Sequence, residues 1–212
     1  MRGIRQGALL AAVLVGAASV QAQTGVQLGV TAGLNMSTLA GGQLGTAKRG
    51  YRYDGMAGGS LIYPVSDMVA IQAELLYSRE GGKVTDSGDE ATFKFDYVTV
   101  PVLLRFALGD AKSQGGPAVY IGPYFAKKVG CSVEVKSGTF SQSGDCTSAG
   151  INVTIKGTDF GATAGGEVAF GSVGIFARYS LGLMSIDDSK PTAENITNRV
   201  ITLGARFSFG SR

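Results

Sequence analysis

The chain has 212 residues, among them 33 glycines, two cysteines and no histidine. Without histidine it cannot form a Ser-His-Asp triad or an imidazole metal site, so enzymes of these classes are excluded. The formal net charge of +3 arises from 19 basic and 16 acidic residues, a near balance that indicates no nucleic-acid partner.

The N-terminal segment is typical of an export signal. Arg2 and Arg5 precede an apolar run over residues 8–15, and Val20 and Ala22 stand at the small-residue positions before a cleavage site. The run is shorter than the about 20 residues of a membrane-spanning helix, and no later segment is long and apolar enough. We therefore predict a signal peptide over residues 1–22 and a mature domain over residues 23–212.

The mature chain contains eight stretches in which apolar residues alternate with Gly, Ser, Thr, Gln or a charged residue. A period of two is typical of a strand with one apolar face, and each stretch has roughly the 9–11 residues of a tilted membrane-spanning strand. The predicted strands cover residues 26–36, 53–63, 68–78, 95–108, 118–127, 158–170, 173–184 and 200–209.

The connections between these stretches alternate in length. Short links at 64–67, 109–116 and 171–172 separate long ones at 39–52, 79–94, 128–157 and 185–199. Short turns at one rim and long loops at the other are typical of outer-membrane barrels, and small polar residues suit a narrow lumen. We predict an all-β fold: an eight-stranded antiparallel up-and-down transmembrane β-barrel with short periplasmic turns and long extracellular loops. A soluble sandwich is the alternative.

Aromatic residues fall near both ends of the predicted strands, as expected of two interfacial girdles. Two prolines, Pro101 and Pro123, lie inside predicted strands, where we expect bulges or kinks because proline lacks an N–H. In the fifth strand either face could be the inner one, since Tyr120 and Tyr124 could face either way against Val119, Ile121 and Phe125. The girdle residues are Tyr63, Phe106, Phe170, Phe207 and Phe209 at the periplasmic ends, and Tyr53, Tyr77, Phe125 and Phe160 at the outer ends.

Six segments carry a resemblance to a known family: 29–39 (GVTAGLNMSTL), 71–83 (IQAELLYSREGGK), 97–106 (YVTVPVLLRF), 121–125 (IGPYF), 159–166 (DFGATAGG) and 177–186 (ARYSLGLMSI). Together they resemble the PorT-like outer-membrane β-barrel proteins. The resemblance implies an outer-membrane location and an eight-stranded barrel. The part of the founding member in type IX secretion need not transfer.

Little in the sequence points to catalysis. It has no GxxxxGK[ST] or GxGxxG motif, so we expect no nucleotide cofactor, and we expect no other cofactor or metal. A hydrolase built on carboxylates would need a pair such as Asp159 and Glu167. These lie on one predicted strand, roughly 27 Å apart at about 3.4 Å per residue, and cannot share a substrate bond. We expect no enzyme.

Cys131 and Cys146 both fall in the long link at 128–157. Because exported chains meet an oxidising compartment, we predict a disulfide between them. A metal site is disfavoured because no further ligands lie nearby. A stapled loop suits a defined binding surface or, more simply, resistance to proteases.

Five charged residues fall on inward faces in the periplasmic half of the predicted barrel: Glu74, Arg105, Glu167, Arg178 and Arg206. The lumen of an eight-stranded barrel is only wide enough for side chains, and buried charges need partners. We predict a Glu–Arg network that plugs the lumen. Scattered charges, each with its own water, are the alternative.

Three classes of function stay open. The favoured one is a structural or protein-interaction barrel that uses its outer loops or periplasmic turns, followed by a small porin or solute channel and then an enzyme. The expected surroundings are outer-membrane lipid, and an envelope or secretion-machinery protein is the partner considered. The sequence does not indicate the oligomeric state.

Overall fold

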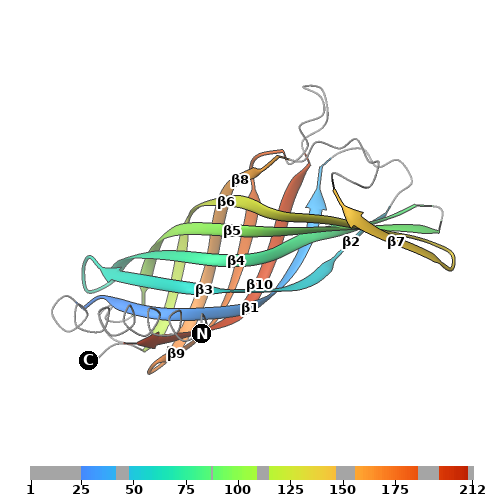
Figure 1. Ribbon diagram of the computed structural model, residues 1–212. Helices are drawn as coiled ribbons and strands as arrows, with labels where there is room; N and C mark the ends of the chain where they lie inside the picture. The colour runs from blue at the N-terminus through green and yellow to red at the C-terminus, as the bar shows by residue number, and fades with distance from the viewer. Residues whose placement is uncertain are drawn as a thin grey trace, which may run out of the picture.

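The computed structural model describes residues 25–41, 48–86, 88–108, 115–146, 156–185 and 196–209, which form a β-barrel (Figure 1). The predicted signal peptide lies outside these residues. Two short strands, β2 (Lys48–Gly50) and β7 (Phe140–Asp145), flank the wall. The wall strands are β1 (Gln27–Ala40), β3 (Arg52–Pro64), β4 (Val69–Asp86), β5 (Asp89–Ala107), β6 (Gly116–Ser137), β8 (Thr158–Phe170), β9 (Val173–Gly182) and β10 (Thr197–Phe209). Within the described ranges, no helix is long and apolar enough to cross a membrane.

The eight wall strands form a closed ring. Each pairs antiparallel with its neighbours in the chain, and β1 also pairs with β10, from Leu28 opposite Phe209 to Ala40 opposite Thr197. Closure leaves no unpaired edge in the wall, which is the condition for a sheet to cross a membrane. The predicted eight-stranded up-and-down barrel is confirmed.

The two faces of the wall have opposite chemistry. Large apolar side chains cover the outside, with Leu34 72% and Leu203 62% exposed, whereas Asn35 and Thr202 point inward and are at most 3% exposed. Such a molecule needs apolar surroundings. All nine predicted girdle residues are exposed: Tyr53, Tyr63, Tyr77, Phe106, Phe125, Phe160, Phe170, Phe207 and Phe209.

The phase of β6, which the sequence left open, is now fixed. Tyr120 and Tyr124 point into the lumen with exposed fractions of 2% and 7%, and Val119 and Ile121 face outward with 50% and 56%. The barrel therefore places two phenol rings inside a narrow lumen.

Two of the predicted long loops are instead continuations of the wall strands. The link at 79–94 is mostly strand, because β4 and β5 remain paired until Asp86 lies opposite Asp89. In the link at 128–157, β6 runs on to Ser137 and turns back as β7. The predicted ends assumed strands of bilayer thickness, but ladder hydrogen bonds extend a hairpin as long as its residues can pair.

The two prolines interrupt the strand pairing, as expected, but neither shifts the register as a bulge would. Pro101 and Pro123 lie inside β5 and β6, and the pairing of these strands is interrupted between the pair Pro101–Tyr124 and the pair Leu104–Ile121. The register is nevertheless the same on both sides of the gap. A missing amide hydrogen removes ladder bonds without requiring an extra residue. The register shift lies instead between Asp96 and Tyr97.

Candidate functional site

The structure brings together the five charged residues that the sequence placed in the lumen. Arg178 donates two hydrogen bonds to the carboxylate of Glu74, at 2.6 and 3.2 Å. Glu167 accepts from two arginines, with Arg105 Nη2 at 2.8 Å from Oε1 and Arg206 Nε at 3.0 Å from Oε2. Each carboxylate is therefore paired across the barrel.

Gln72 joins these two groups into one chain of contacts. Its amide oxygen accepts from Arg105 at 3.1 Å, and its amide nitrogen donates to Glu74 at 2.6 Å. We call these six residues the lumen network. Gln72 was not among the residues expected in the network, although it lies two residues before Glu74 and therefore on the same face of the strand. The network draws on five wall strands: β4, β5, β8, β9 and β10.

Aromatic rings support the guanidinium group of Arg178. It lies 4.4 Å from the ring centroid of Phe176 and 5.8 Å from that of Tyr120, within the range of cation–π attraction. Gly204 makes room for this stacking, because a Cβ there would lie 2.4 Å from the Phe176 ring. The sequence reasoning assigned neither aromatic residue a role.

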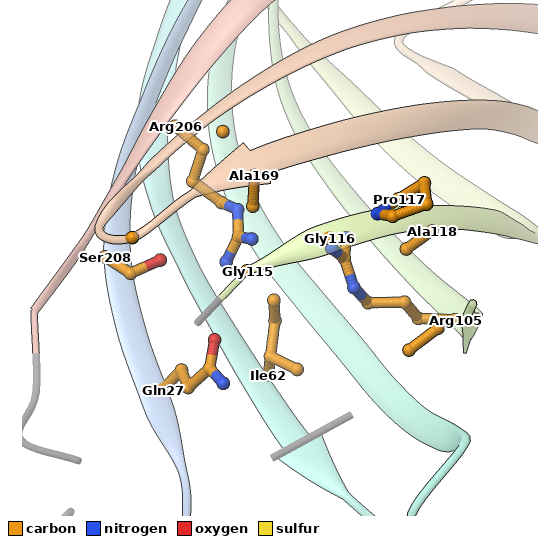
Figure 2. Close-up of a pocket in the computed structure, with 13 residues that line it drawn as sticks. Gln27, Ile62, Arg105, Gly115, Gly116, Pro117, Ala118, Ala169, Arg206 and Ser208 are labelled. Carbon is orange, nitrogen blue, oxygen red and sulfur yellow. The ribbon is translucent and has the colours of Figure 1, made fainter. Parts of the chain in front are cut away.

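Burial makes the pairing in the network essential. The side chains of Arg178 and Glu74 are 4% and 0% exposed, and those of Arg206 and Glu167 are 5% and 1%. A charge buried to this extent without a partner is strongly unfavourable. Figure 2 shows Arg105 and Arg206 pointing into a small cavity beside Gln27 and Ser208. Its volume of about 20 Å³ is room for about one water molecule.

Buried apolar side chains lie beside the network in the lumen. Ile62 and Ala70 pack together near the short-turn ends of β3 and β4. Farther along, Met56, Leu76 and Phe176 form a second buried cluster. In the described part of the barrel, side chains therefore occupy the lumen at several successive levels.

The opposite half of the lumen is acidic and aromatic. Tyr124 donates to Asp159 at 2.9 Å, and Ser78 donates to Glu80 at 2.7 Å, while Asn198 also donates to Glu80. Phe95 and Tyr97 pack with Tyr124 at this end. Glu80 had been placed in a loop because strand β4 was predicted to end at residue 78.

From the outer rim of the barrel onwards, the long hairpins form a second structural unit, whose first inward-facing residues, Glu80 and Phe95, still close the lumen. β4 pairs with β3 only as far as Ser78, and from there it pairs with β5 and β2. We define the outer sheet as β2, β7 and the strand residues 79–86, 89–96 and 128–137. In Figure 1 these strands continue past the wall on the side away from the short turns.

A disulfide closes the base of the β6–β7 hairpin in the outer sheet. Cys131 and Cys146 are bonded, with their Cα atoms 5.6 Å apart. The ladder above them runs from Ser132 opposite Asp145 to Ser137 opposite Phe140. The cross-link therefore holds β7 where it joins the rest of the sheet.

Ion pairs lie on the surface of the outer sheet. Lys94 and Lys136 lie 2.7 and 3.2 Å from the carboxylate of Glu134. Their hydrogen bonds and positive charges lower the pKa of Glu134 to about 2. The contact with Lys94 links β5 to β6, whereas Lys136 lies on the same strand as Glu134, and both contacts are open to solvent.

Comparison with known proteins identifies the family. A family model described as outer membrane protein β-barrel domain matches residues 21–188. The chain belongs to this family. Comparison with curated protein sequences gives no match.

Several solved structures are similar to this chain. The outer-membrane protein OprG from Pseudomonas aeruginosa aligns over 89% of this chain and 98% of its own, with a TM-score of 0.50 and 9% identity. Neisserial surface protein A aligns over 86% and 97%, with a TM-score of 0.47 and 14% identity. Ail, the attachment invasion locus protein of Yersinia pestis, aligns over 86% and 98%, with a TM-score of 0.44 and 17% identity. At such low identity the OprG alignment supports the fold alone.

Membership of this family places the protein in the outer membrane. As in other outer-membrane β-barrels, the short turns face the periplasm and the long hairpins face outward. The lumen network then lies in the periplasmic half, and the outer sheet projects from the cell surface.

Asp159 and Glu167, the carboxylate pair considered for a hydrolase, have separate partners in the lumen. Asp159 and Glu167 are on the same strand, β8, opposite Ala126 and Ala118 of β6. Asp159 contacts Tyr124, whereas Glu167 belongs to the lumen network. Among the described residues, no three His, Cys, Asp or Glu side chains are grouped to hold a metal ion.

Proposed function

We propose that this protein is a non-enzymatic outer-membrane barrel with a closed lumen, which acts as a structural or protein-interaction component of the membrane. The observation that carries the proposal is the continuous chain of contacts from Arg206 to Arg178, with buried apolar clusters beside it. A solute would have to break paired charges in a space that is only wide enough for side chains.

Conductance across a planar bilayer tests the closed lumen. Wild-type barrels should give little steady current, and Arg178→Ala should raise the current, because it removes a guanidinium group that fills the lumen and leaves Glu74 short of its partner. Arg79→Ala is the matched control, since Arg79 lies outside the lumen with 57% of its side chain exposed. Steady wild-type current that Arg178→Ala does not change would contradict the proposal.

The outer sheet is the surface that we propose for binding a protein partner. Among the residues that the structure describes, β7 pairs only with β6 and is almost entirely exposed, so its other edge offers backbone groups to an extended segment of a partner. The disulfide fixes this edge, which lowers the entropy lost on binding. The resemblance to PorT-like barrels supports a partner from the envelope or the secretion machinery.

Photo-crosslinking in intact cells tests the binding surface. A photoreactive residue at position Gln142 in β7 should capture a defined protein. The same residue at Ser66, in the turn between β3 and β4, should not. Capture from Ser66 alone would move the binding surface to the periplasmic turns.

A small solute channel is the second candidate. It is favoured by a cavity of about 30 Å³ in the middle of the lumen, which is lined by the hydroxyl groups of Ser78, Thr99, Thr163, Ser180 and Thr202. Hydroxyl groups of this kind could line a polar path. Steady wild-type conductance would support this function over the closed barrel.

A further inference from the structure

A pocket lies on the outer surface of the barrel, near the extracellular ends of β1, β9 and β10. Its volume is about 320 Å³, and it is lined by Met36 and Thr38 of β1, Tyr179 of β9, and Arg199 and Ile201 of β10. Leu39 and Ala40 of β1, together with Arg49 of β2 and Tyr51 directly after it, complete the wall. We call this the rim pocket.

The strand register places the pocket at the membrane interface. Met36 lies opposite both Ile201 of β10 and Tyr53 of β3, and Ile201 lies opposite Tyr179. These four residues form one outward-facing row that includes two exposed tyrosines, at the level of the outer aromatic girdle. The floor of the pocket is therefore where the hydrocarbon region ends.

An apolar track continues from this floor towards the centre of the membrane. Leu203 lies opposite Leu34, one step below the row of Met36 and Ile201, and both leucines are among the most exposed apolar residues. A lipid chain resting on this track would lead into the rim pocket.

Positive charge lies at the other end of the pocket. Arg199 lies opposite Thr38, two residues beyond Ile201 and about 7 Å farther along the strand towards its outer end. Arg49 stands on the adjacent wall and donates to the carbonyl of Gly41. No acidic residue is among the described residues that line the pocket. Two guanidinium groups above an apolar floor match a phosphate group above an acyl chain.

We propose that the rim pocket binds a phosphate-bearing lipid of the outer leaflet. The phosphate lies between Arg49 and Arg199, and one acyl chain runs past Met36 and Ile201 onto Leu34 and Leu203. Tyr179 flanks the chain at the interface. The site is separate from the lumen network and from the outer-sheet edge, so it does not depend on the proposed function.

Lipid binding by the refolded full chain in neutral detergent micelles tests the proposal, with native mass spectrometry as the readout and purified bisphosphorylated lipid A as the probe. Wild-type protein should retain lipid A. The double variant Arg49→Gln with Arg199→Gln should bind at least about tenfold more weakly, because it loses two charge-assisted contacts. Dephosphorylated lipid A with the same acyl chains should bind wild-type protein as weakly as lipid A binds the double variant.

The control variant is Arg79→Gln, which removes an exposed arginine that is paired with Asp96 and stacked on Tyr77 at another part of the outer side. It should retain lipid A as wild type does. Heat-modifiable migration on gels verifies that every variant is folded. The lipid site would be overturned if the double variant bound lipid A as tightly as wild type, or if Arg79→Gln lost as much binding as the double variant. Displacement of lipid A by millimolar inorganic phosphate would also overturn it.

Discussion

The lumen network and the outer sheet contain the same kinds of ion pair in opposite surroundings. Arg178 and Glu74 have exposed side-chain fractions of 4% and 0%, whereas Arg79 and Asp96 have 57% and 35%. In the lumen, the wall strands hold both partners, and there is little room for water. On the outer sheet, water solvates each charge before and after pairing.

This contrast shows that contact distance does not measure what an ion pair contributes. Exposed pairs contribute about 0–1 kcal/mol, because solvent screens the charges and pairing restrains two long side chains. Breaking a buried pair costs about 3–5 kcal/mol, because one charge is left without a partner. The lumen pairs therefore determine how the barrel interior is packed, whereas the outer pairs contribute little to stability.

The strongest test of the contrast is to remove one arginine from each region. Arg178→Ala should lower the free energy of unfolding by about 3–5 kcal/mol, or less if water enters the lumen. Arg79→Ala should have almost no effect on it, because solvent screens the exposed pair with Asp96. Urea titrations of refolded protein, followed by heat-modifiable migration, measure both. Similar losses for the two variants would remove the distinction between the regions.

A second test compares the two faces of one strand. Leu203→Arg places a charge on the lipid-facing side of β10 and should impair assembly by about 2–4 kcal/mol if position 203 lies near the bilayer midplane. Thr202→Ser, on the inward face, keeps the hydroxyl that donates to Asn35 and should have almost no effect. Equal tolerance at both positions would contradict the assignment of the faces.

The third test separates the outer sheet from the barrel. Replacing Cys131 and Cys146 by serine removes a cross-link that spans 15 residues. Such a link restricts an unfolded loop by about 3 kcal/mol in the chain-entropy model. The β6–β7 hairpin should become sensitive to added protease on intact cells, while the barrel keeps its heat-modifiable migration. Loss of the folded barrel would show that the two units depend on each other.

The smallest effect concerns Glu134 on the outer sheet. Its pKa is about 2 because Lys94 and Lys136 stabilise the carboxylate. A lowered pKa in the folded state contributes stability above the ordinary value of 4.5, and the contribution is lost as the pH falls through about 2. Lys94→Met should raise the pKa of Glu134 towards its ordinary value. An NMR titration of the labelled carboxylate measures this shift, and an unchanged pKa would exclude Lys94 as a main cause.

Where the strands end depended on contacts that the sequence does not reveal. Residues 79–94 contain charges and glycines that are typical of a loop, and the sequence reasoning ended the strand at residue 78. In the structure, β5 supplies a ladder partner for residues up to Asp86. Glu80 is therefore part of a strand, and its side chain faces the lumen. Pairing between two segments is a property of both, so one segment alone cannot predict it.

The sequence by itself determined the faces of the wall, because the alternation of apolar and polar residues has the same period as the side chains of a strand. That period placed Glu74 and Arg178 on inward faces and Leu203 on the lipid face. Tertiary structure decided which charges meet, since Arg178 and Glu74 are 104 residues apart in the chain and come together only after β1 has paired with β10. It also decided the bridging role of Gln72, the phase of Tyr120 and Tyr124, and the rim pocket, because each depends on the register between strands. A period describes one strand, whereas a site in a barrel requires several strands at fixed heights around a closed ring.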